Sequence, residues 1–521
     1  MVFKNEDTFQ TFVSRNRESQ FHKLYDKSVN LVSHQLGRTY YVIINGKKVS
    51  TSQLEKHTSP TDRTITLGYI HKGKSRHAKR AIDAAMNAFE EWSSTDYKKR
   101  VRLFRKITNA MRKRKFELAA WLTLENGKNR YESMADIDEA IDFIEYYSDE
   151  MEKNMGYVRE SSRLNEHNTS VMRPYGVWAI IAPFNFPAAI LVGMSVGALI
   201  TGNTVVIKPA SDTPIIGYKI VEIMNEVGIP NGVINFIPGS GIDIGKTIID
   251  SKAVAGIVFT GSREVGYRIM SESSMKRPRP VIAELGGKNA TIVTDTADLD
   301  TAAEGVVKAA FSYSGQKCSA CSRVYVHRNV KSKFLSILVG KTRKLIVGNP
   351  KNKQSFTGPL INADAYHKFK KYSKLAFNDG NVLIGGAVIS NAEFKHGFYV
   401  EPTIVDGLPK NHTLFKKELF VPVLCITEYD KFDNAIKMTN ESEYGLTSGI
   451  YSNKKEEIAK FLQYIETGVV YVNRKNSSTT GAMVGRQSFG GWKDSGNTGK
   501  GTGGIYYLTQ FMREQSQTIV K

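Results

Sequence analysis

The sequence predicts an α/β protein with a doubly wound parallel sheet and a second α/β lobe. From Val177 onward, short apolar runs alternate with helical stretches, here expected over 211–227 and 241–251. The runs are VWAII (177–181), TVVIK (204–208), VINFI (233–237), GIVFT (256–260) and ATIVT (290–294). Strands that alternate with helices form βαβ units and hence a parallel sheet. The second lobe is predicted from VYVH (324–327), a helix near 331–345, VLI (382–384) and LCITEY (424–429).

The segments on either side of this series have different periods. Residues 76–126 carry apolar side chains at helical spacing, and 131–152 continue as another long helix. The segment 156–176 loses that period and alternates like an extended hairpin. From about Ser488 the chain is a glycine-rich loop followed by a tail suited to an edge strand. Because an edge strand has unpaired backbone groups, such a tail could pair with a neighbouring subunit.

Composition excludes several classes of protein. The chain has 521 residues, of which 41% are hydrophobic and 24% charged, too apolar for a mainly disordered protein. Its length predicts two to four domains or lobes. We expect neither a signal peptide nor an anchor in the polar first twenty residues, and Pro183 and Pro187 interrupt the longest apolar tract, 177–200. The three cysteines, Cys318, Cys321 and Cys425, favour the reducing cytoplasm.

The net charge of +21 could attract nucleic acid, an anionic membrane or acidic metabolites. The basic residues are spread along the chain, and their short clusters lack the interleaved aromatic residues that single-strand binders use. We therefore favour a solvated basic surface and expect neither a nucleic acid nor a membrane partner. The alternative is a basic nucleic-acid-binding protein, which would bind DNA or RNA in a salt-sensitive way and would not require Cys318.

Two glycine-containing turns favour a nucleotide site. Residues 238–245 follow a predicted strand and open a helix, with Gly239, Gly241 and Gly245 in the spacing GxGxxxG. This departs from the usual GxGxxG and is also consistent with a tight strand-to-helix turn. A second turn, 259–262, again lies between an apolar strand and a helix. Backbone N–H groups at such turns can bind a pyrophosphate.

Two reactive side chains lie in segments rich in small residues. Cys318 follows Lys317, which could favour the thiolate, although a buried structural cysteine is the alternative. Cys318 and Cys321 form one CxxC, but no second CxxC or histidine pair completes a metal site. Glu284 ends an apolar strand, where burial would raise its pKa and suit it to general base catalysis. A satisfied carboxylate at a strand end is the alternative.

Seven segments together resemble the aldehyde dehydrogenase superfamily over nearly the whole chain. They are 182–187 (APFNFP), 208–211 (KPAS), 259–262 (FTGS), 284–288 (ELGGK), 315–318 (GQKC), 418–422 (ELFVP) and 489–491 (FGG). The resemblance implies a Rossmann-like NAD(P)-binding domain over 1–155 and 175–284 and an α/β catalytic domain over 285–487. It also implies a small β oligomerisation flap with a C-terminal anchor loop and tail over 156–174 and 488–521, in a homo-oligomer that is a dimer or higher.

The resemblance also implies the chemistry. Cys318 is similar to the nucleophile that adds to the aldehyde and forms a thiohemiacetal. Asn185 and the backbone N–H of Cys318 resemble the oxyanion donors, one of which is worth about 3 kcal/mol of barrier. Hydride then passes to the nicotinamide and leaves a thioester. Glu284 is similar to the base that activates water, so a free acid product is expected.

The cofactor residues are carried over in the same way. Lys208 resembles the residue that holds the adenosine ribose, Glu418 the one that bonds the nicotinamide ribose, and Phe420 the wall beside it. At Ser211, many strictly NAD-dependent relatives carry a glutamate that repels a 2′-phosphate. Serine does not, so we expect NAD with NADP as a usable second cofactor. The remaining expected cofactor residues are Phe184, Gly241, Gly245, Phe259, Gly261 and Ser262.

Within the superfamily, the segments 315–323 and 495–508 resemble the L-glutamate γ-semialdehyde dehydrogenase family. That similarity implies oxidation of L-glutamate γ-semialdehyde, formed from pyrroline-5-carboxylate, to L-glutamate in proline breakdown. The nearest alternative is another aliphatic semialdehyde. The segment 497–502 is one residue longer than the family's anchor loop, and Arg486 and Gln487, which precede Phe489, are assigned no role.

This resemblance also implies the substrate residues. Gly503 and Gly504 match the loop that offers backbone N–H groups to the substrate's α-carboxylate, because glycine permits close backbone approach. The hydroxyl of Ser319 is expected to meet the same carboxylate. Glu139 matches an acid near the amino group, with a helix-surface charge as the alternative reading. Phe186 and Phe511 are expected to pack against the aliphatic stem.

Overall fold

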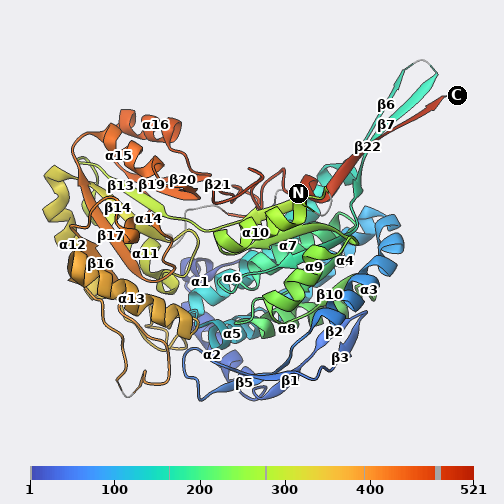
Figure 1. Cartoon of the computed structure of the whole chain (residues 1–521), viewed down its shortest axis with the longest axis horizontal. Helices are drawn as coiled ribbons and strands as arrows, with labels where there is room; N and C mark the ends of the chain where they lie inside the picture. The colour runs from blue at the N-terminus through green and yellow to red at the C-terminus, as the bar shows by residue number, and fades with distance from the viewer. Residues whose placement is uncertain (1–2, 164, 276–277, 392, 476–482, 521) are drawn as a thin grey trace.

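The computed structural model describes residues 3–163, 165–275, 278–391, 393–475 and 483–520. Two α/β lobes lie side by side, and a three-stranded sheet projects from one of them (Figure 1). The predicted α/β class with a parallel sheet is confirmed.

The first lobe contains a seven-stranded sheet. Its strands are β2 (Val42–Ile44), β3 (Lys47–Val49), β8 (Val177–Ile181), β9 (Thr204–Lys208), β10 (Ile234–Phe236), β11 (Val254–Thr260) and β12 (Val281–Glu284). Five strands are parallel, in the order β12-β11-β8-β9-β10, and β2 and β3 extend the sheet antiparallel beyond β10. All four strands predicted between 177 and 260 form within two residues of their expected bounds.

Helices cover both faces of this sheet. One face packs against α3 (Ser75–Ser94), α9 (Lys246–Asp250) and α10 (Arg263–Ser274). The other packs against α2 (Glu18–Ser33), α4 (Tyr97–Lys113), α5 (Lys115–Asn126), α6 (Arg130–Lys153), α7 (Ala189–Ile200) and α8 (Pro214–Val227). Within β8, Trp178 and Ile180 belong to one core and Val177 and Ala179 to the other. Burial on both faces explains why the strand is a continuous apolar run.

The second lobe contains another seven-stranded sheet. Its strands are β13 (Asn289–Val293), β14 (Cys321–His327), β15 (Asn381–Ile384), β16 (Thr403–Asp406), β17 (Val423–Tyr429), β19 (Thr447–Tyr451) and β20 (Val469–Val472). The order is β15-β16-β17-β14-β13-β19-β20, with β15 antiparallel. Its helices are α11 (Leu299–Phe311), α12 (Lys331–Arg343), α13 (Ala363–Asp379), α14 (Thr413–Lys416), α15 (Phe432–Asn440) and α16 (Lys455–Tyr464).

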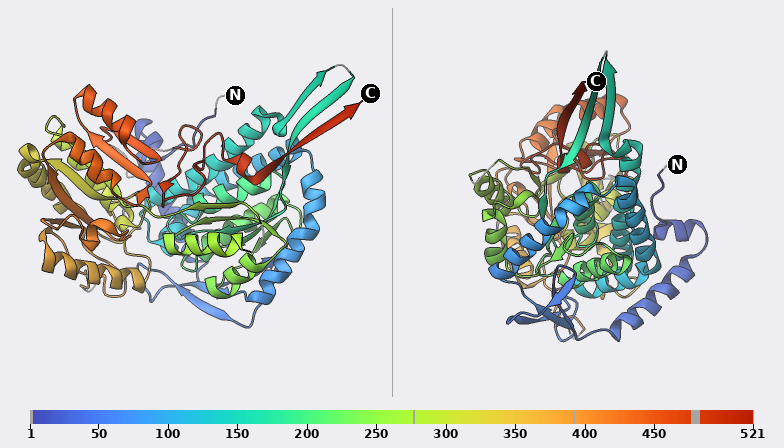
Figure 2. Two further views of the ribbon diagram at one scale, coloured as in Figure 1. Left: turned by 45° about the horizontal axis from the view of Figure 1, so that its top comes forward. Right: turned by 90° about the vertical axis from the view of Figure 1, so that its right-hand side faces the viewer.

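The projecting sheet, called the flap here, joins two distant parts of the chain. Its strands are β6 (Val158–Arg163), β7 (Glu166–Pro174) and β22 (Met512–Val520), in the order β22-β7-β6. The hairpin expected over 156–176 and the expected C-terminal edge strand therefore form one sheet. Figure 2 shows this flap standing away from the lobes in both views.

The remaining elements are small. The N-terminus forms α1 (Phe9–Ser14), and a three-stranded sheet contains β1 (Arg38–Tyr40), β4 (Leu54–Thr58) and β5 (Thr66–His71). Near the C-terminus, β21 (Trp492–Lys493) pairs with β18 (Tyr444–Gly445) of the second lobe. Within the described ranges, no helix has both the length and the apolarity needed to cross a membrane.

Candidate active site

In the first sheet, the order in which successive strands are added reverses between β8 and β11. A large cleft lies at this point. The chain runs from β8 to β9 on one side, whereas β11 and β12 lie on the other. In such sheets the ligand crevice lies outside the carboxyl ends of the strands at this switch point. The cleft has a volume of about 1020 Å³. Its lining includes nine of the residues expected to bind the cofactor: Phe184, Lys208, Gly241, Gly245, Phe259, Gly261, Ser262, Glu418 and Phe420.

Two glycines leave open space in this cleft. Gly241 and Gly245 begin and end η2 (Gly241–Gly245), a π-helical turn that leads into α9 within the helix expected over 241–251. A Cβ added at either glycine would meet no protein atom within 4 Å, so the protein itself does not fill this space. Ser262 caps α10 nearby by accepting a hydrogen bond from the N–H of Val265 (3.4 Å). A helix N-terminus attracts anions, which fits the pyrophosphate expected there.

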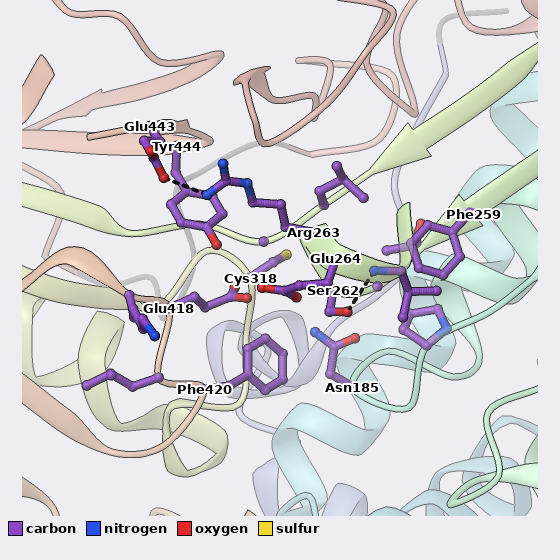
Figure 3. A pocket seen from close by; sticks show the side chains of 18 of the residues that line it. Asn185, Phe259, Ser262, Arg263, Glu264, Cys318, Glu418, Phe420, Glu443 and Tyr444 are labelled. Carbon is purple, nitrogen blue, oxygen red and sulfur yellow. Dashed lines mark hydrogen bonds and ion pairs between the residues drawn. The ribbon is translucent and has the colours of Figure 1, made fainter. Parts of the chain in front are cut away.

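A strained turn presents Cys318 to the cleft. In η3 (Ser312–Gly315), Tyr313 and Ser314 have φ values of 48° and 51°, which side chains disfavour. The N–H of Ser314 donates to Thr357 Oγ1 (2.7 Å), a contact that helps to hold the turn. The surrounding structure therefore fixes the backbone that positions the thiol. Figure 3 shows Cys318 among the cleft side chains, beside Glu418 and Glu264.

Burial keeps the proton on Cys318 in this structure. Loss of solvation, followed by the nearby carboxyl groups of Glu418 and Glu284, raises the pKa of the thiol to about 12. The backbone N–H groups of Ser319 and Cys318 lower it in part. Removal of the proton therefore requires a base or an added positive charge near the sulfur.

A pair of glycines lets Glu418 and the Cys318 loop approach each other. A Cβ on Gly286 would lie 2.3 Å from Glu418 Oε2, and one on Gly287 would lie 2.5 Å from the carbonyl oxygen of Cys318. The N–H of Gly287 donates to Glu418 Oε1 (2.8 Å). Burial nevertheless raises the pKa of Glu418 to about 7. The two glycines after Glu284 thus allow Glu418 and the Cys318 loop to take up their positions.

Glu284 ends β12 next to the C-terminal glycine-rich segment. It forms a β-bridge with Gly496, and the backbone N–H of Gly491 hydrogen-bonds its carboxylate. Its Oε2 is buried and has no hydrogen-bonding partner among the described residues. Burial raises the pKa of Glu284 to about 8. A carboxyl group with a free oxygen and a pKa near neutrality can exchange protons with water or a thiol.

A second, smaller cavity meets the cleft at Cys318. It has a volume of about 240 Å³, and its lining includes Glu139, Phe186, Glu284 and Ser319. Both spaces share Thr260, Leu285 and Cys318. Burial raises the pKa of Glu139 to about 7, aided by the neighbouring Asp136 and Asp142. The thiol thus borders both a cleft large enough for a dinucleotide and a smaller cavity with carboxyl groups in its wall.

A model of the aldehyde dehydrogenase family matches residues 48–517. The chain belongs to the aldehyde dehydrogenase family. A 1-pyrroline-5-carboxylate dehydrogenase from Geobacillus kaustophilus (strain HTA426) is 38% identical over 522 residues, which cover 99% of this chain and 98% of that protein. A crystal structure of 1-pyrroline-5-carboxylate dehydrogenase from Thermus with bound NAD is 35% identical, with a TM-score of 0.93, and the match covers 100% of this chain and 99% of that one.

A longer solved protein is also similar. Proline utilization A from Bdellovibrio bacteriovorus is 34% identical to this aldehyde dehydrogenase, with a TM-score of 0.94. The match covers 99% of this chain but only 53% of that one, so this dehydrogenase spans about half of the longer protein.

Four expected residues lie outside both cavities of the dehydrogenase. Ser211 is exposed on the turn that precedes α8. Phe511 is fully buried with its ring centroid 4.6 Å from that of Trp178, so its ring packs in the core, behind the lining of the small cavity. The N–H groups of Gly503 and Gly504 already donate, to the Tyr147 hydroxyl (3.2 Å) and to the carbonyl of residue 501 (3.3 Å). Neither glycine lines the small cavity, whereas the residue before them, Thr502, does.

Lys317 does not act as the sequence suggested. Its Nζ forms an ion pair with Glu132 Oε1 (2.5 Å) and lies 5.9 Å from the ring centroid of Phe186. Burial and the carboxyl groups of Glu418 and Glu284 raise the pKa of the Cys318 thiol, and the groups that lower it in part are backbone N–H groups, not Lys317. The expectation that the adjacent lysine stabilises the thiolate was therefore wrong.

Several positioning residues of the dehydrogenase were missed. Asn289 Nδ2 donates to the carbonyls of Cys318 (2.7 Å) and Ala320 (2.9 Å) and so ties the nucleophile loop to β13. Asn126 Nδ2 donates to the carbonyl of Phe184 (2.6 Å), beside Asn185. Asn289 directly follows the segment 284–288, a position that could have drawn attention to it. Asn126 ends a helix far away in sequence and had no such signal.

Proposed function

We propose that this aldehyde dehydrogenase oxidises L-glutamate γ-semialdehyde, in equilibrium with pyrroline-5-carboxylate, to L-glutamate, with NAD as the hydride acceptor. The observation that carries the proposal is the position of Cys318, which lines both the large cleft and the small cavity with acidic walls. The full-length similarity to proteins named 1-pyrroline-5-carboxylate dehydrogenase supports the same substrate.

The cleft residues fit NAD. Lys208, Glu418 and Phe420 would hold the two ribose units and the nicotinamide, and the turn at Gly261 and Ser262 would hold the pyrophosphate. The lining already places these five residues around one continuous space. NAD would supply the acceptor for the hydride that leaves the aldehyde carbon.

The chain's own residues carry the remaining steps. Glu284, with a free oxygen and a pKa raised to about 8, takes the proton from the Cys318 thiol. The sulfur attacks the aldehyde carbon. The new oxyanion is met by the side-chain amide of Asn185, which lines the cleft, and by backbone N–H groups at Cys318. Glu284 then releases this proton to solvent and is a carboxylate again. After hydride loss, it deprotonates a water that attacks the thioester carbon. The acid is released as the sulfur leaves as a thiolate, and the thiolate takes the proton back from Glu284.

The small cavity fits an amino acid aldehyde. Glu139 is half-buried in its wall, and its carboxylate form would pair with the substrate's ammonium group. Burial raises the pKa of Glu139 to about 7, and the nearby ammonium charge would favour the ionised form. We propose that Ser319 and the loop at Gly503 and Gly504 bind the α-carboxylate, with the Gly503 N–H turning from the Tyr147 hydroxyl to the ligand. Phe186 lines the same cavity and would contact the aliphatic stem.

The test is formation of NADH and NADPH with three substrates: pyrroline-5-carboxylate, succinic semialdehyde and a simple aliphatic aldehyde of similar length. We expect a strong preference for pyrroline-5-carboxylate, because only its open form carries both an ammonium group and a carboxylate at the same carbon. Equal or faster turnover of the other two would overturn the named substrate while keeping the aldehyde chemistry.

Cofactor choice provides a second prediction. We propose that NADP serves as a second cofactor, since Ser211 brings no negative charge and two lysines, Lys208 and Lys72, lie near each other. Burial, followed by the charge of Lys72, lowers the pKa of Lys208 to about 8. Ser211→Glu is expected to lower the rate with NADP relative to NAD about tenfold, because a carboxylate repels the 2′-phosphate. Ser211→Gln, of the same shape but neutral, is the control and should keep the wild-type ratio. An equal loss in both variants would contradict the electrostatic explanation.

We further propose that the enzyme is a cytoplasmic homo-oligomer that assembles through its flap, without a nucleic acid or membrane partner. The outer strands β6 and β22 each leave one edge unpaired within the described chain. Exposed edges favour pairing with another sheet. The three cysteines are free, which suits a reducing compartment.

A further inference from the structure

The N-terminal arm, defined here as residues 3–8, contributes to the small cavity. It precedes α1 and lies far from every other cavity residue in sequence. Two of its side chains, Asn5 and Thr8, are part of the cavity lining, together with Glu284 and Cys318. None of the motifs that identify the catalytic site includes this arm.

Asn5 is held by hydrogen bonds on both sides of its amide. Its Nδ2 donates to Asp142 Oδ2 (2.9 Å) on α6 and to the carbonyl of Val484 (3.0 Å). Its Oδ1 accepts from Arg486 Nε (3.0 Å). Asp142 and Val484 themselves line the cavity, so Asn5 closes the gap between two of its walls. This contact also explains Arg486, the basic residue before Phe489 for which the sequence offered no role.

Further contacts fix the arm on both sides of Asn5. The N–H of Glu6 donates to Asp142 Oδ1 (2.7 Å), and Arg112 Nε donates to Glu6 Oε1 (2.7 Å). The ring of Phe3 packs edge-on against Tyr146, with ring centroids 5.4 Å apart. The arm is therefore docked on α6 by polar and aromatic contacts and does not hang free.

The 483–487 loop, which hydrogen-bonds Asn5, also contacts the proposed carboxylate site. The N–H of Gly485 donates to the carbonyl of Gly503 (3.1 Å), and a Cβ on Gly503 would lie 3.2 Å from Val484 Cα. A movement of Asn5 would thus be passed through Val484 to the loop that is proposed to bind the substrate.

We propose that the N-terminal arm is a wall of the substrate cavity and that Asn5, held by Asp142 and Arg486, is a residue that determines which length of aldehyde is accepted. The inference rests on the proposed aldehyde oxidation. A neutral amide that fills the gap between α6 and the 483–487 loop shortens the cavity at that wall and keeps the loop in place.

The test compares wild type with Asn5→Ala and Arg486→Ala on pyrroline-5-carboxylate and on straight aldehydes of three to eight carbons. Both variants should raise KM for pyrroline-5-carboxylate, about tenfold for Asn5→Ala, with kcat and KM for NAD little changed. The ratio of kcat/KM for the longest to the shortest aldehyde should rise about tenfold. The double variant should add little to Asn5→Ala, because Arg486 acts through Asn5.

Lys4→Ala is the matched control, since Lys4 lies exposed on the same arm. An unchanged length profile in Asn5→Ala, or an equal change in Lys4→Ala, would overturn the inference. So would an equal fall in kcat and in NAD affinity, because those changes indicate a general structural loss.

A second measurement tests the size of the small cavity without enzyme turnover. With NADH in the cleft, the rate of Cys318 alkylation by iodoacetamide and by N-hexyl iodoacetamide is followed by peptide mass spectrometry. The long reagent should gain at least threefold over the short one in Asn5→Ala, and an unchanged ratio would contradict the inference. A wild-type enzyme that oxidises none of the aldehydes would instead overturn the proposed function, whatever the alkylation ratio.

Discussion

Cys318→Ala is expected to lower aldehyde oxidation by about 10⁴-fold or more while NAD still binds. The thiol is the nucleophile that all later steps depend on, whereas most of the cleft is formed by other residues. The measurement pairs steady-state NADH formation with NADH binding followed by fluorescence. Retained turnover would disprove the nucleophile assignment.

Cys425→Ala is the matched control for this substitution. Cys425 is fully buried in β17 and lines neither cavity, and its thiol donates to the carbonyl of Leu414 (3.4 Å). This variant removes a thiol of the same kind and is expected to keep the wild-type rate, with at most a lower melting temperature. Loss of turnover in both variants would point to damage to the second lobe.

Glu284→Gln is expected to lower steady-state turnover by about 10²- to 10³-fold. Glutamine keeps the shape of the side chain but cannot take a proton from water, so the thioester accumulates on Cys318. Stopped-flow mixing should show an initial burst of NADH close to one per active site if the thiol is still deprotonated by solvent. A variant with full steady-state turnover would show that water is activated elsewhere.

The pH profile provides the control for this role. Because burial raises the pKa of Glu284 to about 8, the carboxyl is largely protonated below that pH and cannot act as a base. Wild-type kcat should therefore rise with pH from 6 to 9 and level off above the pKa. In Glu284→Gln, the rate of thioester hydrolysis should no longer rise with pH over this range. The thiol pKa of Cys318, raised to about 12, acts in the same direction on the burst rate, so the two phases are measured separately.

Strands buried on both faces were the most predictable part of the fold. In β8 and β11, packing on both sides requires a continuous apolar run, and that pattern is local in sequence. The end of β12 was similarly clear, since an acid followed by two glycines interrupts such a run at Glu284. The close contacts at Gly286 and Gly287 explain why no larger side chain can stand there.

Other parts of the site depend on contacts between distant segments. Tyr313 and Ser314 adopt positive φ although neither is glycine, because partners such as Thr357 hold them there. Phe511 precedes an edge strand and resembled a substrate contact, but the space beside Gly197 and Trp178 takes its ring into the core. The contribution of Asn5 could not be predicted either, because its partners lie 137 and 479 residues away. Tertiary packing decides such positions, and no local pattern encodes it.

The two spaces that meet at Cys318 have consequences for how such an enzyme can change over evolutionary time. The cleft is formed by turns after β8 and β11 and by residues near Glu418, whereas the small cavity is formed by α6, the N-terminal arm and the 483–507 region. Among the residues that the structure describes, only Thr260, Leu285 and Cys318 belong to both. Mutations that adapt a descendant to a different aldehyde can therefore accumulate in one set of segments while the dinucleotide site, encoded in another, stays under separate selection.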